Sequence, residues 1–253
     1  MPGRWMRAGY KQAAVLFSPV LILVILASWD GVWELLLSPV YPGLEDYLYT
    51  RIGLWRLIWQ HLVMVSISSF LSICVGVALG VFVTRSAGRD FLPTVNSLVS
   101  IGQTFPPVAV LALAVPAVGF GAEPTIIALF LYGLLPIVRN TITGLQSVAP
   151  EVGESATGMG MTEWQRLWWV EFPLALPVIM AGIKISVVIN IGTATIGATI
   201  GAGGLGAPII TGLASDNPAF ILQGSVLAAL FAITADFVLE LLEKNMSGVF
   251  AVR

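Results

Sequence analysis

The chain has 253 residues, of which 57% are hydrophobic and only 10% are charged. Soluble domains carry about 25% charged residues, so this composition excludes a soluble globular protein and predicts an integral membrane protein. The net charge of −2 gives no reason to expect a nucleic-acid partner, and one cysteine with one histidine can form neither an internal disulfide nor a metal site.

Long apolar runs predict an all-α, polytopic fold with about six transmembrane helices. A spanning helix needs about 20 mostly apolar residues, and sparse charged residues separate the runs here. Asp30 and Glu34 are expected to end the first span, Arg139 is expected to end the fourth, and Pro106-Pro107 breaks the third. The predicted spans cover residues 13–29, 60–83, 92–117, 123–138, 174–199 and 219–239.

The N-terminal segment has two interpretations. Arg4, Arg7 and Lys11 precede an apolar run, as they do in a cleavable signal peptide. No good small-x-small cleavage site follows that run, which favours a retained first span. We therefore expect residues 1–56 to form an N-terminal span and an extracytoplasmic connection, and residues 57–245 to form a transmembrane core that includes a polar loop at 150–173.

Positive charges are distributed unequally between the two sides of this topology. One side holds only Arg51 and Arg56. The other side holds both termini and the loops at 84–91 and 139–173, with Arg4, Arg7, Lys11, Arg85, Arg89, Arg139, Arg166, Lys244 and Arg253. Because cytoplasmic loops carry an excess of Lys and Arg, both termini and the polar loop are expected in the cytoplasm.

The polar loop predicts two short helices joined by a turn. Glu151 and Glu154 lie early in the first helix, where the helix dipole favours acids. Gly158 and Gly160 predict the turn, and Thr162 can cap the second helix. Its apolar face comes from Trp164, Leu167, Trp168 and Trp169. On chemistry alone, the loop could equally be an interfacial amphipathic connection without a partner.

The spacing within this loop resembles the EAA loop of ABC-importer permeases. That loop reads Glu-Ala-Ala, three residues, Gly, nine residues, Ile-x-Leu-Pro; here Ser155, Val170 and Phe172 are mild departures from it. The resemblance implies a type I importer permease fold and a coupling helix that docks into a cytoplasmic ATPase subunit. The residues that it assigns to ATPase coupling are Glu154, Ser155, Ala156, Gly160 and Pro173.

Further segments are similar to the osmoprotectant branch of these permeases, over roughly residues 55–215. They are Gly102 to Pro107 (GQTFPP), Ala128 to Asn140 (ALFLYGLLPIVRN), Gly158 to Met161 (GMGM), Glu171 to Gly182 (EFPLALPVIMAG) and Gly201 to Gly206 (GAGGLG). The resemblance implies import of solutes such as glycine betaine, choline or carnitine across a bacterial plasma (inner) membrane. The alternative within the family is a permease for amino acids or sulfonates.

The family resemblance also implies the partners. A second permease subunit, two ATP-binding subunits and an extracytoplasmic substrate-binding protein are expected around this chain. No Walker A pattern occurs in the sequence, so ATP is expected on the partner subunits, with no cofactor and no catalytic residue in this chain. A channel would need no ATPase, and a secondary transporter would need an ion-coupling relay within the membrane, for which these spans offer only Lys184.

Polar residues within the spans are candidates for a translocation path. Lys184 lies inside an apolar run, where charges are costly and often functional, although it could also snorkel to the cytoplasmic surface. The further path candidates are Gln103, Thr104, Pro106, Asn190 and Thr193. Hydrogen bonding between helices is the commoner use of such polar side chains.

Two other features have plain structural interpretations. The run Gly201 to Gly206 fits G-x-G-x-x-G, but it lacks the strand, helix and acid of a dinucleotide site. It is expected to be a closely packed turn, or alternatively part of an outer gate. His61 stands beside Trp59 and Gln60, and is expected at the membrane interface.

Overall fold

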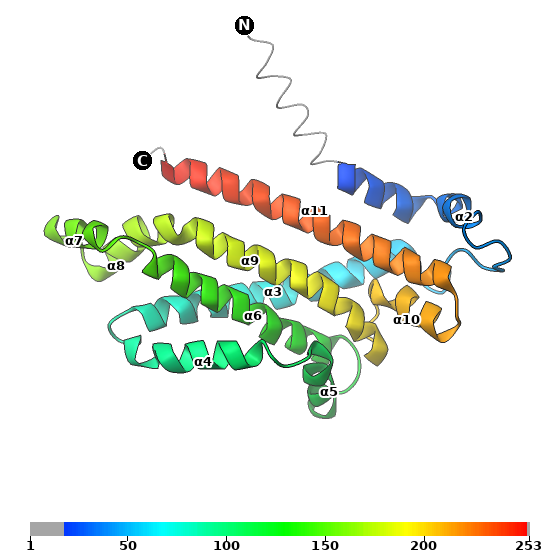
Figure 1. Cartoon of the computed structure of the whole chain (residues 1–253), viewed down its shortest axis with the longest axis horizontal. Helices are drawn as coiled ribbons and strands as arrows, with labels where there is room; N and C mark the ends of the chain where they lie inside the picture. The colour runs from blue at the N-terminus through cyan, green and yellow to red at the C-terminus, as the bar shows by residue number, and fades with distance from the viewer. Residues whose placement is uncertain (1–17, 252–253) are drawn as a thin grey trace, which may run out of the picture.

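The computed structural model describes residues 18–251, with side chains described as far as Lys244, and every regular element in that range is helical. Figure 1 shows long helices lying side by side along one direction. After a first helix over Ser18–Ser28, the elements are α2 (Gly31–Leu37), α3 (Leu54–Thr84), η1 (Arg89–Phe91), α4 (Leu92–Gly102), α5 (Pro107–Val118), α6 (Ala122–Gln146), α7 (Pro150–Gly158), α8 (Glu163–Arg166), η2 (Leu167–Glu171), α9 (Phe172–Ala194), η3 (Thr195–Ile200), α10 (Gly206–Ala214) and α11 (Pro218–Ala251).

The helices are long and apolar enough to cross a membrane four to six times. Four stretches qualify alone: Leu54–Thr84, Ala122–Gln146, Glu163–Ile200 and Pro218–Lys244. Two further pairs qualify if each bent pair is one span: Ser18–Ser28 with α2, bent by 100°, and Arg89–Gly102 with α5, bent by 98°. The predicted all-α fold with about six spans is confirmed, as is the break at Pro106-Pro107.

Several predicted boundaries are wrong. The first helix ends at Ser28, close to the predicted end at residue 29, but Glu34 lies within the next helix, α2; residues 13–17 of the first predicted span lie outside the described residues. Helix α3 begins at Leu54, six positions before the predicted residue 60. Helix α6 continues past Arg139 to Gln146. Backbone hydrogen bonding extends these helices beyond the apolar runs, because charged side chains at the ends can reach water while the backbone stays helical.

Helices α3, α6 and α9 form the centre of the bundle, where small residues let the backbones approach closely. A side chain at Gly133 of α6 would collide with Ser72, Ser186 and Asn190 from the two neighbouring helices. A Cβ at Gly182 of α9 would lie 2.9 Å from the backbone oxygen of Pro136. The close contact of these three helices therefore depends on glycine.

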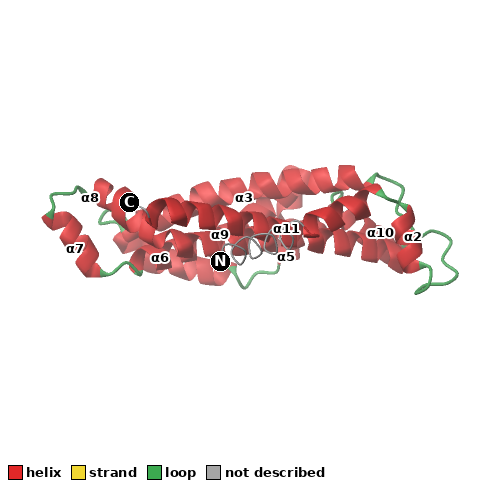
Figure 2. Cartoon of the chain, turned by 90° about the horizontal axis from the view of Figure 1, so that it is seen from above, coloured by secondary structure: helices red, strands yellow, loops and turns green. Residues whose placement is uncertain are grey.

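The two ends of the bundle are built from different elements. At one end lie α7, α8, the loop between α3 and α4, and the C-terminal part of α11 (Figures 1 and 2). At the opposite end, α2 and the chain around Tyr49 pack with Leu205 and Leu227 into one apolar cluster. The backbone amide of Tyr49 donates a hydrogen bond of 3.0 Å to buried Gln223 of α11, which fixes this end.

Candidate functional site: the α7–α8 elbow

The polar segment from residue 150 to residue 171, here called the elbow, contains a sharp turn after α7. Pro150 starts α7, where its missing amide hydrogen costs no helical bond. After Gly158 ends the helix, Gly160 adopts φ +83°, a left-handed conformation that favours glycine. The amides of Gly160 and Met161 donate to the carbonyl oxygens of Thr157 and Ala156, at 2.9 and 3.1 Å. The predicted turn is therefore present, and Gly160 is the residue that permits it.

Thr162 caps the second helix of the elbow, as expected. Its Oγ1 accepts a bond of 3.3 Å from the amide of Gln165, whose side-chain Oε1 accepts one of 2.9 Å from the amide of Thr162. This reciprocal pair is a capping box, which satisfies two amides that the first helical turn leaves free. Only the cap at Thr162 was predicted from the sequence; the Thr-x-x-Gln spacing is the signal that would have predicted the complete capping box.

The second arm of the elbow passes without a break into the next span. Between α8 and α9, residues Leu167–Glu171 form a turn of π-helix, and the helical stretch continues from Glu163 to Ile200. The π-turn directs Leu167 and Glu171 inward, while Trp164, Trp168 and Trp169 remain exposed. Pro173 therefore does not begin a separate helix but follows the π-turn within one continuous rod.

Glu171 joins three parts of the elbow to the end of α3. Its carboxylate lies 2.6 Å from Nη1 of Arg85, at the C-terminal end of α3. It also accepts a bond of 2.8 Å from Nε of Arg166, whose Nη1 donates one of 3.2 Å to Oγ1 of Thr157 on α7. Glu171 is only 9% exposed, so the two arginines neutralise a carboxylate that would otherwise be costly to bury.

The predicted coupling residues occupy different environments. Glu154, Ser155 and Gly160 are exposed on the elbow, whereas Ala156 is buried inside it. Glu154 lines a polar hollow of about 440 Å³ between the two arms, together with Thr157 and Arg166. Residues 154–160 thus form one surface, while Pro173 lies at the start of α9. The network of Arg85, Arg166 and Glu171 was missed, because Arg85 is distant from Glu171 in sequence and the five-residue separation of Arg166 and Glu171 is not the i,i+3 or i,i+4 spacing of a helical ion pair.

The structure does not gather the predicted path residues into one site. Gln103, Thr104 and Pro106 lie exposed at the bend between α4 and α5. Asn190 is fully buried and donates a bond of 3.3 Å to Oγ of Ser69 on α3, which is the interhelical alternative for such a residue. Half-buried Thr193 follows on α9. Lys184 forms an ion pair of 2.8 Å with Glu243 of α11.

His61, which was expected at the membrane interface, has a side chain that is fully buried inside the bundle. Its Nδ1 accepts a bond of 3.3 Å from the amide of Leu205, and its Nε2 lies 3.0 Å from the carbonyl oxygen of Ile191. Gln60 Oε1 accepts a bond of 3.2 Å from the amide of Gly204, one of three glycines in this loop with positive φ. The run of glycines is thus a tightly packed turn held by α3.

Together, these features define a polytopic helical membrane protein in which the second arm of the polar elbow continues directly into a span. The chain belongs to the family of binding-protein-dependent transport system inner membrane components, whose model matches residues 72–248. It is 41% identical over 92% of its length to the osmoprotectant import permease protein OsmY of Salmonella typhimurium, covering 95% of that protein. It is 43% identical to the glycine betaine/carnitine/choline permease protein OpuCB of Bacillus subtilis, over 74% of this chain and 86% of the relative.

Solved structures share the same fold. The chain aligns with an inward-facing form of the MetNI methionine ABC transporter at a TM-score of 0.69, covering 78% of this chain and 99% of that one, at 24% identity. An amino acid ABC transporter solved with histidines aligns with a TM-score of 0.62 and 18% identity, over 76% of this chain and 93% of that one. The predicted importer-permease fold is therefore confirmed.

Proposed function

We propose that this chain is the membrane-spanning subunit of an ATP-driven importer of osmoprotectants such as glycine betaine, choline or carnitine. The observation that carries the proposal is the similarity to an osmoprotectant import permease, at 41% identity over 92% of the chain. This similarity extends over the elbow, the broken α4–α5 pair and the central helices, so it covers most of the permease chain rather than one motif.

Around this chain we place two ATPase subunits, a second permease subunit and an extracytoplasmic substrate-binding protein. The elements at the elbow end in Figure 1 include the end of α3 with Arg85, η1 with Arg89, α8 with Arg166 and the C-terminal part of α11 with Lys244, whereas Arg51 and Arg56 belong to the start of α3 and the chain before it, toward the opposite end. By the positive-inside rule, this distribution supports a cytoplasmic elbow and cytoplasmic termini in the bacterial inner membrane. ATPase subunits would then meet the exposed face of α7.

In this proposal the elbow transmits the closure of the ATPase dimer to the spans. Glu154 supplies polar docking, and Gly160 permits the turn that presents α7. Ser155 adds a second exposed polar contact, Ala156 packs α7 onto the elbow, and Pro173 lies where the elbow enters α9. In this proposal ATP binds to the partner subunits, and this chain contributes the helices that move in response.

Uptake into vesicles tests the proposed substrate. The whole assembly is reconstituted with its binding protein, and uptake of labelled glycine betaine, choline and proline is measured with and without ATP inside. We expect ATP-dependent uptake of at least one quaternary ammonium solute. ATP-dependent uptake of amino acids or sulfonates alone would contradict the osmoprotectant proposal and favour the alternative branch.

The coupling role has a separate test. Gly160→Asp should leave the protein inserted but abolish uptake, because the added carboxylate puts a new negative charge on the exposed surface of residues 154–160 that meets the ATPase. Co-purification of the ATPase subunits reports assembly, and labelled solute reports transport. Normal uptake by this variant would remove the coupling role from Gly160.

A further inference from the structure

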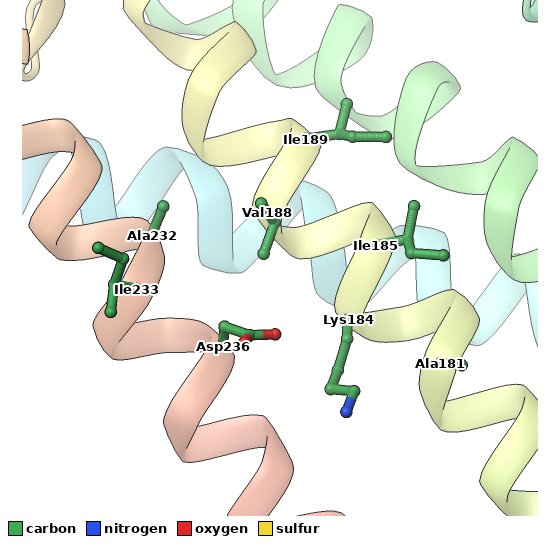
Figure 3. A pocket seen from close by; sticks show the side chains of 8 residues that line it. All are labelled: Ala181, Lys184, Ile185, Val188, Ile189, Ala232, Ile233 and Asp236. Atoms are coloured by element: carbon green, nitrogen blue, oxygen red, sulfur yellow. The ribbon is translucent and has the colours of Figure 1, made fainter. Parts of the chain in front are cut away.

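A groove between α9 and α11 combines an aliphatic wall with two opposite charges (Figure 3). Its volume is about 560 Å³, within the range of small-molecule sites. Its charged side chains are Lys184 of α9 and Asp236 of α11. The remaining lining residues are aliphatic, namely Ala181, Ile185, Val188, Ile189, Ala232 and Ile233.

The two charges differ in their partners. Lys184 is held by Glu243, at 2.8 Å, while Lys244 holds Glu240 at 2.6 Å. Asp236 forms no ion pair with any side chain between residues 18 and 244. Figure 3 shows its carboxylate pointing from α11 toward α9, beside the stem of Lys184. The groove therefore contains a carboxylate that belongs to no ion pair, and its charge attracts that of the paired Lys184 beside it.

This groove lies within the membrane-spanning part of both helices. Lys184 is near the middle of α9, and Asp236 lies within the stretch Pro218–Lys244 that is apolar enough to span. A charge at such a depth is costly in lipid and normally faces protein or a water-filled cavity. The charged face of the groove is thus unsuited to lipid and suited to the interior of the transporter.

Quaternary ammonium groups have chemistry that complements this groove. Their methyl groups donate no conventional hydrogen bond, so they favour apolar contacts combined with electrostatic attraction from one negative group. No aromatic side chain lines the groove to attract a cation through its ring face. The Asp236 carboxylate is then the group that attracts the cation, with Ile233 and Val188 beside it for the methyl groups.

Resting on the proposed function, we infer that this groove is a transient binding site for the quaternary ammonium head group during passage, with Asp236 as its counter-ion. Lys184 lies on the opposite wall and attracts the carboxylate of a zwitterionic solute such as glycine betaine. Choline, which has no carboxylate, uses Asp236 alone. A passage site must bind strongly enough to admit the solute and weakly enough to release it, which one carboxylate on an aliphatic wall achieves.

The first test removes the Asp236 charge in the reconstituted assembly. Asp236→Asn should lower choline and glycine betaine uptake at low concentration about tenfold or more, the effect expected for losing a close charge contact. Asp236→Glu should restore most of it. The matched control is Glu240→Gln, one turn further along α11 and outside the groove, which should keep wild-type uptake.

The second test separates recognition from a structural role. The double variant Lys184→Gln/Glu243→Gln removes both charges of the ion pair and leaves neither carboxylate nor ammonium unpaired. It should lower glycine betaine uptake several-fold and leave choline uptake unchanged. Equal losses for both solutes would mean that Lys184 only braces the helices, and would overturn its assigned role.

Three outcomes are distinguishable for the site itself. Wild-type uptake rates in Asp236→Asn would overturn the site while leaving the importer proposal intact. Loss of the assembled complex in that variant, seen by size-exclusion chromatography, would assign Asp236 to a subunit contact and overturn the site as well. Failure of the wild-type assembly to take up any quaternary ammonium solute would instead reject the proposed function on which the site rests.

Discussion

Arg85 at the end of α3 and Glu171 at the start of α9 form an ion pair, with Nη1 and Oε2 separated by 2.6 Å. Arg166 binds the other oxygen of the same carboxylate, so the elbow, the π-turn and α3 meet at one side chain. A displacement of α7 would therefore reach α3 through polar contacts and α9 through the continuous backbone. Both the polar route to α3 and the backbone route to α9 start at the π-turn, Leu167–Glu171.

Glu171→Gln should destabilise the protein by about 2 kcal/mol, since it would lose the ion pair with Arg85 and weaken the charge-assisted hydrogen bond from Arg166. The midpoint of thermal unfolding in detergent measures this change. Glu163→Gln provides the control, because that exposed carboxylate contributes to α8 only through the helix dipole, about 0.5 kcal/mol. Equal shifts for the two variants would show that the Glu171 network adds no stability.

Substitutions at Gly160 should rank by their tolerance of positive φ. No atom lies within 4 Å of an added Cβ, so backbone strain alone decides the outcome. Gly160→Asn should be tolerated well, whereas Gly160→Val should cost about 1–2 kcal/mol and reduce ATP-dependent uptake. Gly158→Ala, also free of contacts but helical, should stabilise α7. Indistinguishable uptake by the Asn and Val variants would argue against a strict need for this turn.

Gly133→Ala should loosen the centre of the bundle. The added methyl carbon would lie 2.7 Å from Oγ of Ser186 and 2.8 Å from Nδ2 of Asn190, so either these side chains or α6 itself must shift. Overpacking of this kind costs about 1–3 kcal/mol. The control is Gly192→Ala on α9, where nothing lies within 4 Å. Thermal unfolding should separate the two variants, and a Gly133→Ala protein as stable as the control would refute the close-packing account.

His61→Leu should destabilise the turn of glycines at the far end of the bundle. The Leu205 amide would lose its acceptor in a buried position, which costs about 1–3 kcal/mol. His61→Gln retains an acceptor and should recover part of the loss. Hydrogen exchange at residues 201–206 provides a local measurement. Unchanged protection in the leucine variant would mean that Gln60 and the surrounding packing hold the turn alone.

The spans and the elbow could be predicted from sequence because each has a local physical signal. Apolar runs mark membrane crossings, and Gly160 and Thr162 are a turn residue and a cap whose effects need no distant partner. The ends of α3 and α6 could not be predicted in this way. Hydropathy locates the apolar stretch, whereas helix ends are set by backbone hydrogen bonds that continue beyond it.

Interactions between distant residues account for most of what the sequence did not reveal. Arg85 and Arg166 contributed to the prediction of topology only as positive charges, and their shared partner Glu171 lies in a position that the family spacing leaves open. The buried contacts of His61 were not predicted, because its neighbours Trp59 and Gln60 indicated only an interface, while its partners are the backbone groups of Ile191 and Leu205. Such pairings require the folded arrangement of α3 and α9.

The uninterrupted helical rod from Glu163 to Ile200 has a mechanical consequence. A flexible loop between the elbow and the span would absorb small displacements of the elbow before they reached the span. If the elbow couples to an ATPase as proposed, a tilt applied at Trp164 would be carried along this one helical stretch to Thr193 and to the glycine turn at the far end. Movement of the elbow would then reach the opposite side of the membrane through the helix backbone, without a relay of successive side-chain movements.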